Sequence, residues 1–244
     1  MPLVSIKVDN IAALRLIKRL KEPDPSHAAV LAEIAGADGI TCHLREDRRY
    51  IRDRDLYILK EVVNSKLTVQ ISPVEELIER AIEVKPWMVT LMPPTNDDTV
   101  VGSGINLDAD RDLYADTALN LKGAGINVAY FVDPDIDAVK GAARAKADAV
   151  ELNTGDYVRA GTIDSAEEEL DRLEQMARLA AKLGLMANCG GGLNYRNIRP
   201  LTELGVFEEF TIGHAAVARA LMVGVERAVR ELVEIIHLPS DGGS

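Results

Sequence analysis

The sequence has few cysteines, few aromatic residues and no excess of positive charge. Its 244 residues include two cysteines, 4% aromatic residues and a formal net charge of −11. Two cysteines within apolar runs, Cys42 and Cys189, predict reduced buried thiols and not a disulfide framework. Nucleic acids and anionic membranes require a basic protein face, so the negative charge disfavours both as partners.

Long apolar runs are also absent from the sequence. No stretch reaches the roughly eighteen apolar residues that a membrane-spanning helix needs, and the N-terminus lacks a signal-peptide pattern. We therefore expect a cytoplasmic protein. The length and the 47% hydrophobic fraction predict a single domain over residues 1–244, with residues 239–244 as a disordered tail.

Short β-forming runs alternate with helical patterns along the whole chain. The expected strands lie at residues 4–9, 39–44, 67–72, 87–92, 126–132, 149–153, 185–189 and 208–212. A long loop is expected at 95–106 and one closing helix at 215–236. Strand-then-helix units repeated in this way predict a (β/α)8 TIM barrel. A doubly wound sheet is the competing architecture, but no glycine fingerprint follows the first strand.

Polar side chains gather near the carboxyl ends of the expected strands, which form the active-site face of such a barrel. The side chains expected to point into its mouth are those of Lys7, Asp9, His43, Arg45, Gln70, Glu151 and Asn153. Each alone has an ordinary explanation as a solvated or internally paired residue. Burying all of them without partners or ligand would cost a few kcal/mol apiece, so together they predict a site.

Two glycine signals follow the last two strands. Gly190–Gly192 follows the seventh strand, and Gly213 with His214 opens the helix after the eighth. Free backbone N–H groups and a helix N-terminus at these places favour a phosphate group, although three adjacent glycines also suit a loose turn. We expect a small phosphorylated substrate.

The segments AGADGITCHLREDRR, VDNIAALR, and TIGHA with its ARALMVG helix resemble the pyridoxine 5′-phosphate synthase family. The resemblance runs in the same order from Val4 to about Val233. It implies a (β/α)8 barrel with an additional N-terminal helix, commonly assembled as an octamer from dimers. It also implies condensation of 3-amino-2-oxopropyl phosphate with 1-deoxy-D-xylulose 5-phosphate, with no metal or organic cofactor.

The resemblance assigns roles to several of the residues already singled out. Asp9 matches an amino-ketone-binding aspartate, His43 an acid/base histidine and Arg45 a substrate-binding arginine. The expected phosphate-binding positions are the matching Gly192, Gly213 and His214, together with Gly191 from the same glycine run.

Several family positions carry different residues in this chain. The family's asparagine and histidine near the first strand are Lys7 and Asn10 in this chain, and its first-helix arginine is Lys18. A second family histidine is Tyr50, and the strand-three glutamate is Gln70. The threonine of the long loop is Val100, and the histidine between the strand-seven glycines is Gly191. Gln70 cannot act as a general base near neutral pH and Gly191 cannot act as a general acid. Each lost group contributes typically about 10²–10⁴-fold, so we expect an altered acid/base set.

Lys7 allows two kinds of role. A lysine partly desolvated in a barrel mouth can form a Schiff base with a carbonyl substrate. The alternative is an ion pair with Asp9 or Glu151, or a phosphate contact. The predicted catalytic residues are His43, Glu151 and Lys7, and the predicted substrate-binding residues are Asp9, Asn10, Lys18, Arg45, Gln70 and Asn153.

Three functions remain open at this point. The first is a family enzyme acting on a small phosphorylated ketone or amino-ketone through His43 with Glu151 or Lys7 in altered roles. The second is the synthase itself, with the substitutions tolerated. The third is a non-catalytic protein, which either binds a phosphorylated ligand or serves as a homo-oligomeric scaffold. In all three we expect a homo-oligomer without a metal.

Overall fold

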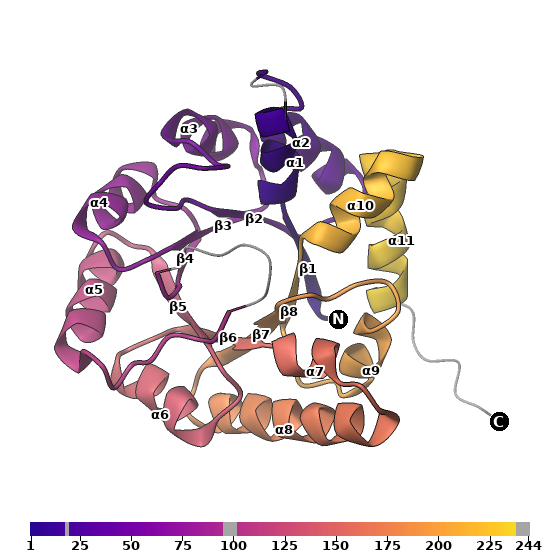
Figure 1. Cartoon of the computed structure of the whole chain (residues 1–244). Coiled ribbons are helices and arrows are strands. Elements are labelled where there is room, and N and C mark those ends of the chain that lie inside the picture. Colours follow the sequence, from indigo (N-terminus) through magenta and orange to yellow (C-terminus); the bar gives the residue numbers. More distant parts are fainter. Residues whose placement is uncertain (18–19, 95–101, 238–244) are drawn as a thin grey trace.

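The computed structural model describes residues 1–17, 20–94 and 102–237. It is a closed barrel of parallel strands in sequence order, and β1 pairs with both β2 and β8 (Figure 1). The strands are β1 (Leu3–Lys7), β2 (Gly39–His43), β3 (Lys66–Ile71), β4 (Met88–Leu91), β5 (Asn127–Val132), β6 (Ala149–Asn153), β7 (Met186–Gly190) and β8 (Glu209–Ile212). Closure confirms the (β/α)8 barrel and excludes the doubly wound sheet.

Helices surround the strands as an outer ring (Figure 1). They are α1 (Asp9–Leu14), the short 3₁₀ helix η1 (Arg15–Ile17), α2 (Pro25–Ile34), α3 (Asp53–Val62), α4 (Glu75–Val84), α5 (Arg111–Gly123), α6 (Ile136–Arg144), α7 (Gly155–Arg159), α8 (Ile163–Lys182), α9 (Ile198–Glu203), α10 (His214–Val223) and α11 (Val225–His237). The additional N-terminal helix is α1, which follows β1. The closing helix expected at 215–236 is two helices, because Gly224 breaks it at a φ of 86°.

The two faces of each strand have different surroundings. Outward side chains such as Val4, Ile40 and Val69 are fully buried in the core between strands and helices. Inward side chains are largely polar, and the hydroxyls of Ser5 and Thr41 lie 2.7 Å apart inside the barrel. The period-2 alternation of the strands therefore leaves a polar interior.

A buried ion pair fastens η1, the 3₁₀ helix that follows α1, to α3. Arg15 donates two hydrogen bonds to the Asp55 carboxylate, at 2.9 and 2.6 Å, and a third to the carbonyl of Tyr50. Both charged side chains are almost fully buried. Breaking such a pair leaves an uncompensated charge, so it fixes η1 against α3.

Several expectations fall outside the described residues. These are the role of Lys18, most of the loop expected at 95–106, and the tail at 239–244. Residues 102–106 are described and have neither helix nor strand. Cys42 and Cys189 are buried and free, as expected. A helix long and apolar enough to cross a membrane is not found in the described ranges.

Candidate functional site

Three of the predicted side chains form one chain of contacts in the barrel interior. Lys7 ends β1, and its Nζ donates a 2.6 Å hydrogen bond to Oε1 of Gln70 on β3. Nε2 of Gln70 donates to the Glu151 carboxylate of β6, at 3.1 Å from Oε2. The amide thus bridges an ammonium group and a carboxylate, and Lys7 reaches Glu151 through Gln70.

The Glu151 carboxylate is enclosed by the barrel wall. Burial raises its pKa above the ordinary value, opposed by the charge of Lys7 and by contacts from Gln70, Thr211 and Thr90. A Cβ atom built on Gly190 would lie 2.5 Å from Oε1 of Glu151. Only glycine therefore leaves room for this carboxylate at the end of β7.

His43 ends β2 and lies in register with Gln70. Burial lowers the pKa of its imidazole well below 6.5, and the positive charges of Lys7 and Arg45 lower it further, against a smaller opposing effect of Asp47. The ring is therefore neutral near pH 7. Its backbone N–H donates a 2.8 Å hydrogen bond to Oδ1 of Asp9, which fixes the end of the strand.

Asp9 and Arg45 lie beyond the ends of their strands. Sequence alternation had instead predicted both side chains on the inner face of the barrel. The β1 ladder stops at Lys7, and Asp9 begins α1, where a negative charge suits the positive end of a helix. β2 stops at His43, and Arg45 is a buried loop residue that donates two 2.9 Å hydrogen bonds to Asp47. Arg45 is thus already engaged with a carboxylate.

Asn153 ends β6 and contacts a loop and the neighbouring strand end. Its Nδ2 donates to Oδ1 of Asp133 at 2.7 Å and to the Gly102 carbonyl at 2.9 Å. Its Oδ1 accepts from the backbone N–H of Gly155 at 2.9 Å. Both ends of the amide are therefore used within the protein, which makes Asn153 a support for the loop after β4.

The glycine signals lie after the adjacent strands β7 and β8. Gly191 and Gly192 have φ angles of 114° and 80°, which side-chain-bearing residues rarely adopt. The carbonyls of Gly191 and Gly192 accept hydrogen bonds from Thr154 and Asn197, and no side chain caps α10 at Gly213. His214 is exposed, with Nδ1 3.5 Å from Nδ2 of Asn10. Backbone N–H groups at such a helix start suit a phosphate group.

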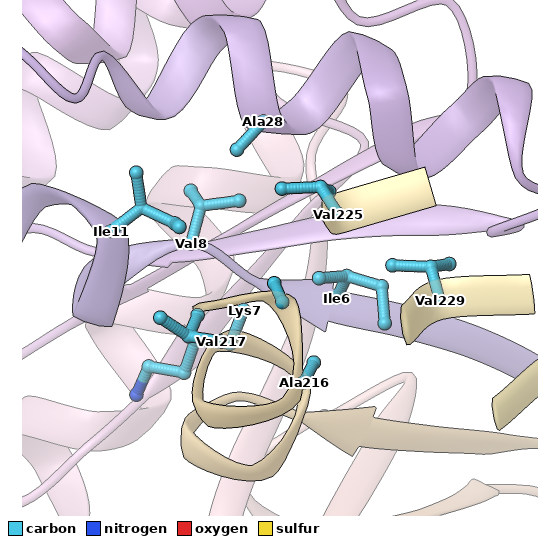
Figure 2. Close-up of a pocket in the computed structure, with 10 residues that line it drawn as sticks. Ile6, Lys7, Val8, Ile11, Ala28, Ala216, Val217, Val225 and Val229 are labelled. Atoms are coloured by element: carbon cyan, nitrogen blue, oxygen red, sulfur yellow. The ribbon is translucent and has the colours of Figure 1, made fainter. Parts of the chain in front are cut away.

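The small cavity on the other side of Lys7 is apolar and too small for a ligand. Its volume is about 10 Å³, and apolar side chains from β1, α1, α2, α10 and α11 line it. In Figure 2 the Lys7 side chain extends away from Ala28, Val225 and Val229. This cavity is therefore not a ligand site beside Lys7. Within the described ranges, no group of three or more His, Cys, Asp or Glu residues is arranged to hold a metal ion.

Several polar residues of the barrel wall were not predicted from the sequence. Thr90 and Thr211 contact Glu151, Asp133 holds Asn153, and Glu209 is a second buried glutamate. Both threonines lie within the expected strands at 87–92 and 208–212, so following the alternation through these strands would have found them. Glu209 lies in the same alternation, two residues before Thr211, whereas nothing local indicates the pairing of Asp133 with Asn153.

The chain is similar to curated proteins that are named pyridoxine 5′-phosphate synthase. A pyridoxine 5′-phosphate synthase from Geobacter metallireducens is 42% identical over 233 residues, which cover 96% of this chain and 98% of the relative. One from a Synechococcus species is 42% identical over 235 residues, with the same coverage.

Solved structures of low sequence identity agree with the fold. Phosphoribosyl anthranilate isomerase from Thermus thermophilus aligns with a TM-score of 0.60 at 16% identity, covering 96% of this chain and 98% of that chain. The isomerase from Thermotoga maritima gives 0.59 at 14% identity, covering 97% and 98%. The model of the pyridoxal phosphate biosynthesis protein PdxJ family matches residues 4–238. With this match and relatives at 42% identity, the chain belongs to the PdxJ family of pyridoxal phosphate biosynthesis proteins.

Proposed function

We propose that the chain is a pyridoxine 5′-phosphate synthase-like enzyme with an altered acid/base set. It acts on a small phosphorylated ketone or amino-ketone by condensation or ring closure, without a metal or organic cofactor. The main support for this proposal is that the start of α10 and the polar barrel centre share one mouth. A Cβ atom built on Gly213 would lie 3.3 Å from Cβ of Lys7.

His43 is the acid/base group in this proposal. Its ring is neutral near pH 7 because of burial and neighbouring positive charge, so it is able to accept a proton. Gln70 and Gly191 offer no exchangeable acid or base, and Glu151 lies behind Gln70. Proton transfer at the substrate therefore falls to His43, with Glu151 and Lys7 in altered roles.

Phosphate binding is assigned to Gly191, Gly192, Gly213 and His214. Asp9, Asn10, Lys18, Arg45, Gln70 and Asn153 complete the proposed substrate site, with Asp9 and Asn153 acting through the backbone and loop that they hold. A homo-oligomeric assembly, a cytoplasmic location and the absence of nucleic-acid and membrane partners are further parts of this proposal.

Turnover tests the proposal directly. The purified protein is incubated with 3-amino-2-oxopropyl phosphate and 1-deoxy-D-xylulose 5-phosphate, and both phosphate release and pyridoxine 5′-phosphate are followed by mass spectrometry. We expect the vitamer to form, and His43→Gln to lower its rate by about 100-fold or more. The control is His27→Gln, which changes an exposed histidine on α2 and leaves the rate unchanged.

Two outcomes contradict parts of the proposal. If His43→Gln keeps the full rate, the acid/base assignment is wrong. If a phosphorylated ketone binds but neither vitamer nor phosphate appears, the synthase assignment fails. The remaining functions are then a Schiff-base reaction through Lys7 and binding of a phosphorylated ligand alone.

A further inference from the structure

Lys7 lies at the end of a hydrogen-bonded chain whose direction is set by its partners. Gln70 presents its Oε1 to the Lys7 ammonium and its Nε2 to the Glu151 carboxylate. The reversed amide would place two sets of donors together and leave the carboxylate facing an oxygen atom. Glu151 therefore fixes the amide of Gln70, and the amide fixes the position of the ammonium.

The ammonium form of Lys7 fits this chain. An ammonium group has three N–H donors. Among the described residues, Gln70 accepts a hydrogen bond from one of them. Its charge is balanced by Glu151 across the amide. Imine formation needs a neutral amine and would break the 2.6 Å hydrogen bond to Gln70, so the geometry favours a charged role over a covalent one.

A neutral base and a place for phosphate lie beside this ammonium group. The positive charge of Lys7 lowers the pKa of His43 on the neighbouring strand β2. The start of α10 runs along the Lys7 stem, because a Cβ on Gly213 would lie 3.3 Å from Cβ and 3.7 Å from Cδ of Lys7. A ligand whose phosphate binds at α10 therefore has its next carbons near Lys7 and His43.

We propose that Lys7 is a catalytic residue that stabilises the enolate oxygen of a phosphorylated ketone while His43 removes the adjacent carbon-bound proton. The proposal deepens the proposed function, since it takes its substrate class from it. The C–H electron pair forms the new C=C bond, the carbonyl π pair moves to oxygen, and the proton goes to His43. Lys7 donates an N–H to the resulting oxyanion, and His43 returns the proton to carbon or to oxygen.

The physical basis is electrostatic preorganisation. A donor already held where negative charge develops requires no rearrangement during the reaction, and losing one such donor costs about 10²–10³-fold in rate. Gln70 and Glu151 are positioning residues in this scheme, because they act on the substrate through Lys7. Neither of them needs to gain or lose a proton.

Hydrogen–deuterium exchange at carbon tests the step without the second substrate. The protein is incubated in D₂O with dihydroxyacetone phosphate or with 1-deoxy-D-xylulose 5-phosphate, and loss of the C–H signal next to the carbonyl is followed by NMR. We expect exchange by the native protein, and Lys7→Met to lower its rate at saturating ketone by about 100-fold. Gln70→Met, which removes the bridge, should lower it in the same direction.

Lys66→Met is the matched control. Lys66 begins β3 at the opposite end of the barrel and lies over the Trp87 ring, with Nζ 4.3 Å from the ring centre. Its removal should leave the exchange rate unchanged. Far-ultraviolet circular dichroism and thermal unfolding of each variant separate loss of fold from loss of catalysis.

Three results would overturn the assignment of Lys7. The first is no exchange by the native protein. The second is a Lys7→Met variant that needs more ketone but reaches the native rate, since Lys7 would then only bind ligand. The third is a reduced ketone adduct on Lys7 after sodium borohydride treatment, found by peptide mass mapping, which would show an imine.

The same data keep the two proposals apart. Exchange that depends on Lys7, without formation of the vitamer from both substrates, supports the role of Lys7 and contradicts the synthase assignment. Formation of the vitamer at an equal rate by the native protein and by Lys7→Met contradicts the proposed role of Lys7 and leaves the synthase assignment standing.

Discussion

Glu209 is a carboxyl group buried in the barrel wall, on β8 in register with Asn188 of β7. Burial raises its pKa to about 7, the negative charge of Glu151 adds to this effect, and Lys66 opposes it. The folded protein therefore holds a proton on Glu209 at pH values where an exposed glutamate has lost it. This makes Glu209 a source of pH-dependent stability that is separate from the proposed chemistry.

The raised pKa of Glu209 makes the folded protein less stable as the pH increases. Because the folded pKa lies above the ordinary 4.5, the contribution of Glu209 to stability is complete below about 4.5 and is lost as the pH rises through about 7. We predict that Glu209→Gln removes this loss. Relative to the native protein, the free energy of unfolding of the variant should rise by about 2–3 kcal/mol between pH 5 and pH 8.

Urea unfolding at pH 5, 6, 7 and 8 measures the difference. Glu208→Gln is the control, since the neighbouring glutamate is exposed and its variant should follow the native protein at every pH. Parallel pH dependences of the native protein and Glu209→Gln would contradict the assignment.

The connection between β4 and α5 is held against the end of β5 by its last residues. The N–H groups of Gly104 and Ile105 donate to Oδ1 of Asp133 and to the carbonyl of Phe131, both at 2.8 Å. Asn153 joins Asp133 to the Gly102 carbonyl from β6. Two strand ends therefore set the path of this segment beside the barrel mouth.

Two glycines of this segment offer a matched pair of substitutions. A Cβ on Gly104 would lie 2.2 Å from the backbone nitrogen of Asp133, whereas a Cβ on Gly102 would meet nothing within 4 Å. We predict that Gly104→Ala lowers the free energy of unfolding by about 1–3 kcal/mol, because backbone must shift to admit the methyl group. Gly102→Ala should change it by no more than about 0.5 kcal/mol. Urea unfolding measures the free energy of unfolding of both variants. Equal effects of the two substitutions would show that close packing around Gly104 does not fix the segment.

The barrel elements could be predicted from sequence where local pattern decides the structure. Period-2 alternation located the eight strands and gathered Lys7, His43, Gln70 and Glu151 in one interior. Alternation does not say where a ladder stops. Asp9 was therefore placed on a strand that ends at Lys7, and Arg45 was expected on the inner face although β2 ends at His43.

Contacts between distant residues had no local signal. The ion pair of Arg15 with Asp55 and the hydrogen bond of Asp133 with Asn153 join segments that meet only in the closed barrel. The helix break at Gly224 did have a signal, because glycine is the residue that most readily adopts a positive φ. It was hidden by the continuous apolar pattern on either side.

At the scale of the whole molecule, exposed apolar side chains gather on one side of the helical ring. The term apolar face is used here for the exposed apolar residues of η1, α2 and α10 together with Leu20. They are Leu16, Ile17, Leu20, Val30, Leu31, Ile34, Leu221 and Met222. Helices α1, α2, α10 and α11 contact one another, and they lie together in Figure 1. A large apolar surface of this kind typically marks a protein–protein interface.

We predict that the proposed homo-oligomer assembles through the apolar face. Ile34 and Met222 are 64% and 78% exposed in the single chain, and burying such side chains against a second copy removes apolar area from water. Ile34→Lys combined with Met222→Lys should therefore shift the protein toward the monomer, as measured by light scattering coupled to size-exclusion chromatography. Ile163→Lys is the control, because Ile163 is 76% exposed at the start of α8, away from this face. A native protein that is monomeric at all concentrations, or a double variant with the native mass, would show that the apolar face does not drive assembly.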